Sequence, residues 1–246
     1  GRLYLYSTAG YATAGLLDAC TSYGTQLLWP FSDARISWSI ISIIDPLFTA
    51  PLLILTAWAV FRKRTLFGKA AAIYAVAYLS LGLTQHQRAR SYLEDVIGER
   101  EHSSATRLLV KPSFANLLLW RTLYLYDGHY YIDAVRVGFF GDKKTYAGAH
   151  LPAFDVEETL KDLPPGTSLA EDLRRFQHFS NDYLAALPQE PSFITDLRYS
   201  DVPNSTAPLW GLNLSDINEA GHAAFETRRD ITEEDREALM RMIKGH

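Results

Sequence analysis

The chain has 246 residues, of which 48% are hydrophobic and 21% are charged, and its formal net charge is −4. This length predicts one or two domains. The slightly acidic balance argues against a nucleic-acid-binding protein, which needs a basic patch. The single cysteine, Cys20, excludes an internal disulfide and a cysteine metal cluster.

Charged residues are unevenly distributed along the chain. They are few before His86 and occur every few residues after it. This asymmetry predicts membrane helices in residues 1–88, a juxtamembrane linker in 89–112 and a small soluble α+β domain in 113–246. The chain also begins without an initiator Met, inside an apolar segment, so we expect it to be a fragment or to lack an upstream part.

Three apolar stretches are candidates for transmembrane α-helices. Leu3–Leu17 is uncharged but short, so the alternative is a buried helix of a soluble domain. Ile36–Phe61 has 26 residues with Asp45 as its one charge, which matches the length of a spanning helix. Ala70–Thr84 is uncharged and is expected to continue as a polar helix over residues 85–101.

The intervening segment Cys20–Ser37 predicts a loop at the membrane surface, because it combines helix breakers with interfacial aromatic residues. The basic cluster Arg62–Arg64 predicts a cytoplasmic turn. With that turn inside, Asp18, the loop and Asp45 would converge near the outer face. The soluble domain would then lie outside the cytoplasm.

The soluble part predicts an antiparallel sheet with two or three helices. Residues 113–140 read as a β-hairpin around Asp127-Gly128. We expect further strands at Tyr146–Phe154, Phe193–Tyr199 and Pro208–Leu214, a helix at Ser168–Leu187 with a Ser168–Glu171 capping box, and a helix at Ile231–Ile243 capped by Thr232.

Asp18 is the strongest candidate for a functional residue. A carboxylate at the polar end of a membrane helix can ligate a metal, or can cap the following turn. Asp45 could be a second ligand, or could accept a hydrogen bond from a loop donor such as Tyr23 or Arg35, which is the interpretation that we favour. Arg35 could bind a phosphate oxygen, or could form a solvated pair with Asp33.

Other ionisable residues give weaker indications. None of the seven histidines has a recognised metal spacing. His86 leaves the membrane near the proposed outer face, where a surface histidine is the commoner explanation. Three arginines in predicted strands could bind an anion together or pair with nearby aspartates on a solvated sheet face, and we favour the pairing: Arg121, Arg136 and Arg198 with Asp127, Asp133 and Asp196.

Two segments carry a family resemblance: Leu16–Ser32, LLDACTSYGTQLLWPFS, and Ile43–Thr49, IIDPLFT. They resemble the YdjM-type metal-dependent hydrolases of the bacterial inner membrane. Later segments also fit, so that the resemblance covers nearly the whole chain: residues 112–121, Arg175-Phe176 with Phe179-Ser180, 196–199 and 208–211.

The resemblance implies a membrane-bound hydrolase of a phosphoester or lipid-like substrate, with a divalent metal, zinc, as cofactor. Asp18 would be a metal ligand, and Asp45 and Arg35 would orient the ligand or the substrate. In the family, a histidine stands one helical turn before this aspartate, and further metal motifs lie upstream. Here the position is Ala14 and those motifs are absent, so we expect poor metal binding. The alternative is a non-catalytic, membrane-anchored binding module with an extracytoplasmic α+β domain.

Overall fold

The computed structural model describes residues 1–164 and 166–246, including every side chain in these ranges except that of Arg2. The chain divides into two compact units. The first contains residues 1–92, 110–120 and 137–142, and the second contains 93–109, 121–136 and 143–246. The predicted linker, 89–112, includes the last turns of one helix and the first strand.

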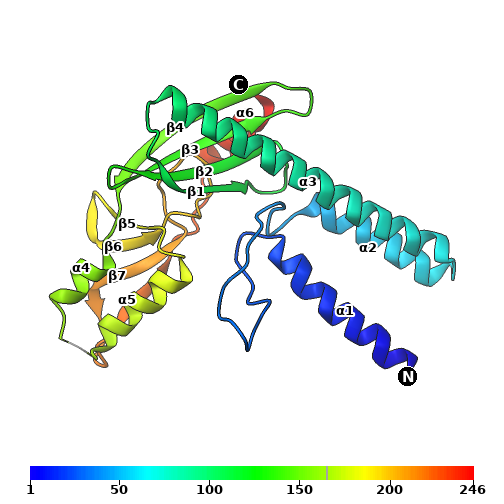
Figure 1. Ribbon diagram of the computed structural model, residues 1–246, viewed down its shortest axis with the longest axis horizontal. Helices are drawn as coiled ribbons and strands as arrows, with labels where there is room; N and C mark the ends of the chain where they lie inside the picture. The colour runs from blue at the N-terminus through cyan, green and yellow to red at the C-terminus, as the bar shows by residue number, and fades with distance from the viewer. Residues whose placement is uncertain (165) are drawn as a thin grey trace. The chain divides into compact units, whose positions relative to one another are not determined.

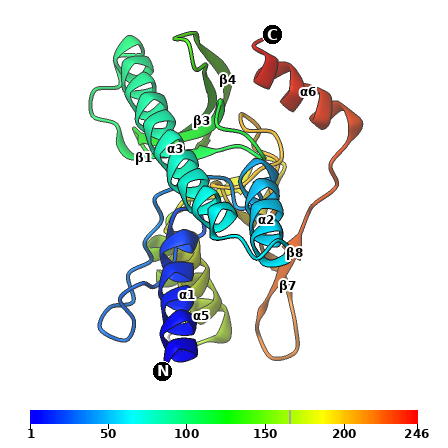
Figure 2. The same cartoon turned by 90° about the vertical axis from the view of Figure 1, so that its right-hand side faces the viewer.

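Three helices dominate the first unit: α1 (Arg2–Ala19), α2 (Pro46–Phe61) and the first part of α3 (Thr65–Glu99). Figures 1 and 2 show α2 lying beside α3. Aromatic contacts join this pair, with ring centroids 5.4 Å apart for Phe48–Tyr78 and 5.7 Å for Trp58–Phe67. In the described part of the chain, α3 is the one helix that is long and apolar enough to cross a membrane.

The prediction of one spanning helix over Ile36–Phe61 is wrong, because α2 begins only at Pro46. Asp45 is its N-cap residue, and the Asp45 carboxylate accepts a hydrogen bond from the Phe48 backbone N–H at 3.1 Å. A capping carboxylate followed by proline at the first helical position is a strong start signal. The 16 residues of α2 span about 24 Å, and residues 36–45 are irregular. The predicted helix over 70–84 is confirmed, and it continues through α3 to Glu99.

The irregular segment packs closely against α3 at Gly82. A Cβ atom at Gly82 would lie 2.5 Å from the Ile40 carbonyl oxygen, so only glycine fits there without a backbone shift. Ile40 and Ile41 are buried with Cys20 and Phe48 in one apolar cluster. Gly82 therefore allows the segment before α2 to pack directly on α3.

Replacing Gly82 with alanine should lower the free energy of unfolding by about 1–3 kcal/mol, the usual cost of overpacking. Gly68→Ala is the matched control, since a Cβ at Gly68 has nothing within 4 Å. In a helix, glycine to alanine is otherwise stabilising by about 1 kcal/mol. Unfolding in mixed micelles measures both variants, and equal stabilisation of the two would contradict the close approach.

The remaining chain forms two four-stranded antiparallel sheets rather than the single sheet that we expected. The second sheet pairs, for example, Ala185 with Thr195 and Ile194 with Leu212. The first sheet has the order β1 (Thr106–Pro112), β2 (Leu119–Tyr126), β3 (His129–Val137) and β4 (Lys143–Pro152), and the second has β5 (Leu184–Leu187), β6 (Glu190–Asp196), β7 (Trp210–Ile217) and β8 (Ala223–Thr227).

Helices α4 (Val156–Lys161), α5 (Ser168–Phe179) and α6 (Glu233–Lys244) complete the second unit. One buried cluster in this unit combines side chains from both sheets, including Leu123, Ile132 and Ala185.

Two predictions for the second unit are confirmed, one of a turn and one of a helix cap. The Asp127-Gly128 turn is confirmed, with φ values of 47° and 71° that suit a two-residue hairpin. The Thr232 cap of α6 is also confirmed, as a capping box with Asp235.

The single helix predicted over Ser168–Leu187 is wrong, because α5 ends at Phe179 and Leu184 begins β5. Asn181 and Asp182 adopt positive φ between the two elements. The expected Ser168 cap is also wrong. The side chain of Thr167 is the one that accepts a hydrogen bond, from the Ala170 N–H.

Candidate functional site

Asp18 lies in the last turn of α1 with an exposed side chain. Its carboxylate accepts a hydrogen bond from the Thr25 hydroxyl. The following turn is closed by the backbone carbonyl of Asp18 instead, which accepts hydrogen bonds from the Thr21 N–H at 3.0 Å and the Thr21 hydroxyl at 2.8 Å. The carboxylate is therefore not needed to close this turn, and it faces the loop.

Asp45 has a different environment, because it is only 4% exposed. The Tyr78 hydroxyl lies 3.0 Å and 2.9 Å from its two carboxylate oxygens, in addition to the Phe48 N–H described above. Tyr78 comes from α3, a partner that the local sequence does not indicate. Through these hydrogen bonds Asp45 links the start of α2 to the middle of α3.

Arg35 holds the base of the loop between α1 and α2. Its Nη2 donates to the carbonyl oxygens of Tyr23 at 2.9 Å and Gly24 at 3.3 Å. A two-way backbone bridge between Thr25 and Ile36, at 2.9 Å in each direction, lies beside these contacts. Arg35 and Asp18 therefore both contact the base of the same loop, Asp18 through Thr25.

A zinc ion at this loop would need ligands in addition to Asp18. No group of three or more His, Cys, Asp or Glu residues that could hold a metal is found among residues 1–164 and 166–246. Position 14, one turn before Asp18, carries the methyl group of Ala14. Since a zinc site needs at least three protein ligands, the described residues do not form one by themselves.

The arginines predicted to pair with aspartates behave differently from one another. Arg198 pairs with Asp196 at 2.7 Å as expected, but the pair is buried rather than on a solvated face. Asp133 instead pairs with Arg100 at 2.6 Å. Arg121 is 2% exposed and donates only to carbonyl oxygens among the hydrogen bonds that we identify.

His86 is half-buried rather than a surface histidine. Its Nε2 lies 3.2 Å from the Val110 carbonyl oxygen, and its ring packs edge-on against Trp120 with centroids 5.7 Å apart. These contacts give His86 a packing role.

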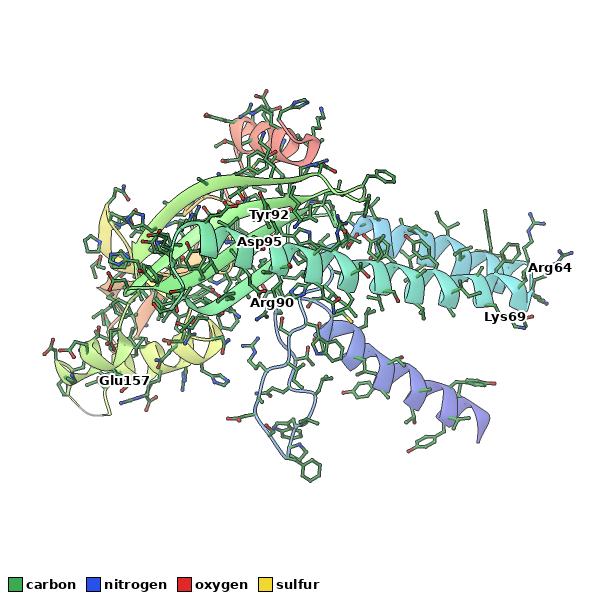
Figure 3. The ribbon with its side chains drawn as sticks, turned by 45° about the horizontal axis from the view of Figure 1, so that its top comes forward. Arg64, Lys69, Arg90, Tyr92, Asp95 and Glu157 are labelled. Atoms are coloured by element: carbon green, nitrogen blue, oxygen red, sulfur yellow. The ribbon has the colours of Figure 1, made fainter. Side chains whose placement is uncertain are left out.

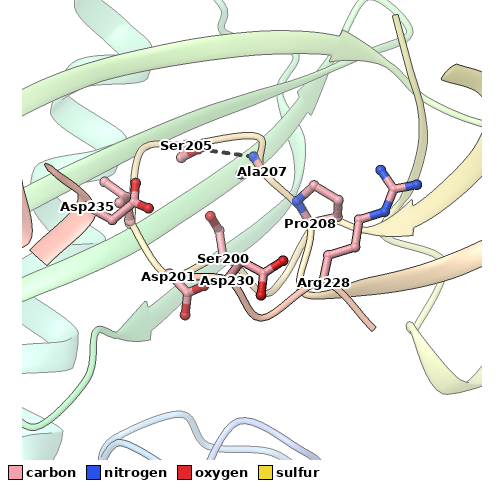
Figure 4. Close-up of a pocket in the computed structure, with 9 residues that line it drawn as sticks. Ser200, Asp201, Ser205, Ala207, Pro208, Arg228, Asp230 and Asp235 are labelled. Carbon is pink, nitrogen blue, oxygen red and sulfur yellow. Dashed lines mark hydrogen bonds between the residues drawn. The ribbon is translucent and has the colours of Figure 1, made fainter. Parts of the chain in front are cut away.

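An acidic hollow of about 200 Å3 in the second unit has no counterpart in the sequence predictions (Figure 4). Asp201 and Asp235 line it together with Asp230 and Arg228. The sequence around Asp201 signals only a turn, so nothing local indicates that α6 supplies a second carboxylate. As stated above, these aspartates do not form a metal-binding group.

Asp201 should make the stability of the second unit depend on pH. Burial raises the pKa of Asp201, the charge of Asp235 raises it further, and Arg229 opposes the rise. A carboxyl group with a raised folded-state pKa is most favourable when protonated, so stability should fall as pH increases from about 4 through this pKa. Asp201→Asn should therefore raise the thermal midpoint at pH 7 and leave it little changed at pH 3. Exposed Asp216→Asn serves as the control, and an equal change at both pH values would contradict the assignment.

Residues 2–89 match the YdjM inner membrane protein family. No curated protein and no solved structure gives a significant match. The predicted resemblance is confirmed over this range, and beyond residue 89 it stays a prediction.

The YdjM-like region contains α1, α2 and most of α3, and it includes Asp18, Arg35 and Asp45. The matched family is one of inner membrane proteins, and α3 is long and apolar enough to cross a membrane, so both findings point to association with the lipid bilayer.

Proposed function

We propose that this protein is a membrane-anchored binding module, in which the YdjM-like region anchors the two-sheet domain, and that this domain engages an envelope component outside the cytoplasm. The observation that supports the proposal is the change in character along α3. Its first part exposes large apolar side chains, including Ile73 and Val76, whereas Leu93, Val96 and Ile97 near its end are buried. One continuous helix thus combines a lipid-type surface with a protein-core surface.

The charges along α3 fit this division. Figure 3 shows Arg64 and Lys69 at one end of the helical hairpin, and Arg90 and Asp95 on the other half of α3. The 18 residues from 70 to 87 carry no formal charge. They span about 27 Å as a helix, close to the hydrocarbon thickness of a bilayer.

Cysteine labelling in spheroplasts tests the expected orientation. In a Cys20→Ala background, Glu219→Cys would place a thiol in the β7–β8 turn, and Lys63→Cys would place one in the basic turn. We expect a membrane-impermeant maleimide to label the first in spheroplasts and the second only after lysis. Labelling of Glu219→Cys only after lysis would contradict an extracytoplasmic domain.

A second candidate is a metal-dependent hydrolase of a phosphoester or lipid-like substrate. It is favoured by the exposed carboxylate of Asp18 within the matched region. In this proposal Asp18 is one zinc ligand, and Arg35 and Asp45 hold the surrounding backbone in place. When bound, the metal would activate water and polarise the phosphoryl group, but the other ligands would have to come from groups beyond the described residues.

Zinc content and phosphodiesterase activity separate the two candidates. For a hydrolase, Ala14→His should raise bound zinc. Asp18→Ala should reduce zinc affinity by at least about 10-fold, because changing a group that only hydrogen-bonds to a metal ligand already costs that much. Asp33→Ala, an exposed carboxylate in the same loop, is the matched control. Zinc bound equally well by Asp18→Ala and Asp33→Ala, together with equal phosphodiesterase activity of the two variants, would contradict the role of Asp18 and leave the binding module as the function.

A further inference from the structure

The loop between α1 and α2 presents three large apolar side chains at its tip, Leu28–Phe31. Leu28 is 55% exposed, Trp29 is 70% exposed and Phe31 is 94% exposed. Exposed apolar side chains gathered at one point indicate an interaction site. The first two figures show this loop as the blue segment that leaves the end of α1 and turns back toward α2.

Backbone hydrogen bonds give the tip a defined shape. The Phe31 and Ser32 N–H groups donate to the Leu28 carbonyl oxygen at 2.8 and 3.1 Å, and the Trp29 N–H donates to the Gln26 oxygen at 3.2 Å. The base is closed by the Thr25–Ile36 bridge and by Arg35, as described above. The exposed side chains therefore project from an ordered turn, and little conformational entropy is lost when they bind.

The position of the loop along α3 follows from the contacts at its base. The Trp38 N–H donates to the Ala19 oxygen at 2.7 Å, which ties the loop to the end of α1. Ile40, two residues later, touches α3 at Gly82. Gly82 lies 18 residues after Arg64, or about 27 Å along a helix. This distance matches the hydrocarbon core, so the base of the loop lies at the bilayer surface opposite the basic turn.

We propose that the tip Leu28–Phe31 inserts into the lipid interface on the side of the bilayer opposite Arg62–Arg64. Lipid fits the tip because tryptophan and phenylalanine favour the boundary between headgroups and acyl chains. The charged residues Asp33 and Arg35 follow the tip directly, at the height of the headgroups. The base of the tip also packs on α3, the helix that can cross the membrane, so its insertion needs no separate recruitment.

Site-directed spin labelling of the full chain in phosphatidylethanolamine–phosphatidylglycerol vesicles tests the proposal. In the Cys20→Ala background, Phe31→Cys is the test site, Val76→Cys on α3 is the lipid reference, and Glu234→Cys on α6 is the aqueous reference. Phe31 and Val76 are exposed, so their substitution should leave the fold intact. The measured quantity is the ratio of accessibility to oxygen over accessibility to a soluble nickel chelate.

The Phe31 label should give a ratio between those of the two references. A ratio equal to that of the Glu234 label would overturn the proposal, as would a label shielded from both reagents, which would indicate a protein contact. Quenching by brominated lipids gives a second measurement without labels. Brominated lipids should quench a smaller share of the tryptophan fluorescence in Trp29→Phe than in the wild type. An equal share in the two proteins would also overturn the proposal.

Discussion

Replacing Arg121 with leucine should destabilise the second unit by about 3–5 kcal/mol, because three backbone carbonyl groups lose a buried hydrogen-bond donor. The guanidinium reaches across from β2 to the loop after β6. It donates to the Leu197 oxygen at 3.0 and 2.7 Å, to the Pro203 oxygen at 2.7 Å and to the Ser205 oxygen at 2.9 Å. A leucine would leave these carbonyl groups without that donor, and each unsatisfied buried group costs about 1–3 kcal/mol.

Chemical unfolding monitored by near-ultraviolet circular dichroism measures this loss. Arg174→Leu on the exposed side of α5 is the matched control, because it removes the same charge without a buried contact. Arg174→Leu should change stability by less than about 0.5 kcal/mol. If Arg121→Leu were equally mild, the role of Arg121 as a structural anchor would be refuted, and an anion site would again need consideration.

Replacing Asp45 with alanine should cost about 2–4 kcal/mol in the helical region. The change removes the N-cap of α2, worth about 1 kcal/mol. It also leaves the half-buried hydroxyl of Tyr78 without its acceptor, at a cost of about 1–3 kcal/mol. This is an effect on folding, in contrast to the orienting role in catalysis that the family resemblance implies.

A double-mutant cycle with Tyr78→Phe isolates the shared contact, using unfolding in mixed micelles. The two single changes should together cost more than the double change, with a coupling energy of about 0.5–3 kcal/mol. Strict additivity would show that the Asp45–Tyr78 contact contributes nothing. Asp45→Ser is a useful further variant, since serine can still cap α2 but is too short to reach Tyr78 in the same way.

Several features could be predicted from the sequence because their signals are local. The uncharged run from Ala70 onward predicts the apolar part of α3, since the helical rise converts its length directly into a membrane thickness. Asp127-Gly128 specifies the hairpin, because both turn residues need positive φ. Thr232 starts α6 because its side chain satisfies a free backbone N–H.

The candidate site was only partly predictable. The sequence identified Asp18, Arg35 and Asp45 as unusual polar groups in an apolar region, but it did not distinguish their surroundings. Asp18 is exposed, whereas Asp45 is buried against Tyr78, which lies 33 residues away in the chain. No local sequence pattern predicts such a contact, because it forms only when α2 and α3 pack against each other.

The sequence by itself determined where the chain is apolar, where it turns and where helices can start, because each of these depends on a few neighbouring residues. The tertiary structure alone decided that Ile36–Phe61 is not one helix, that the strands form two sheets, and that Arg121 binds carbonyl groups instead of aspartate. These outcomes depend on partners that are distant in sequence. Their common physical reason is that buried polar groups must find hydrogen-bond partners, and only the folded chain determines which partners are within reach.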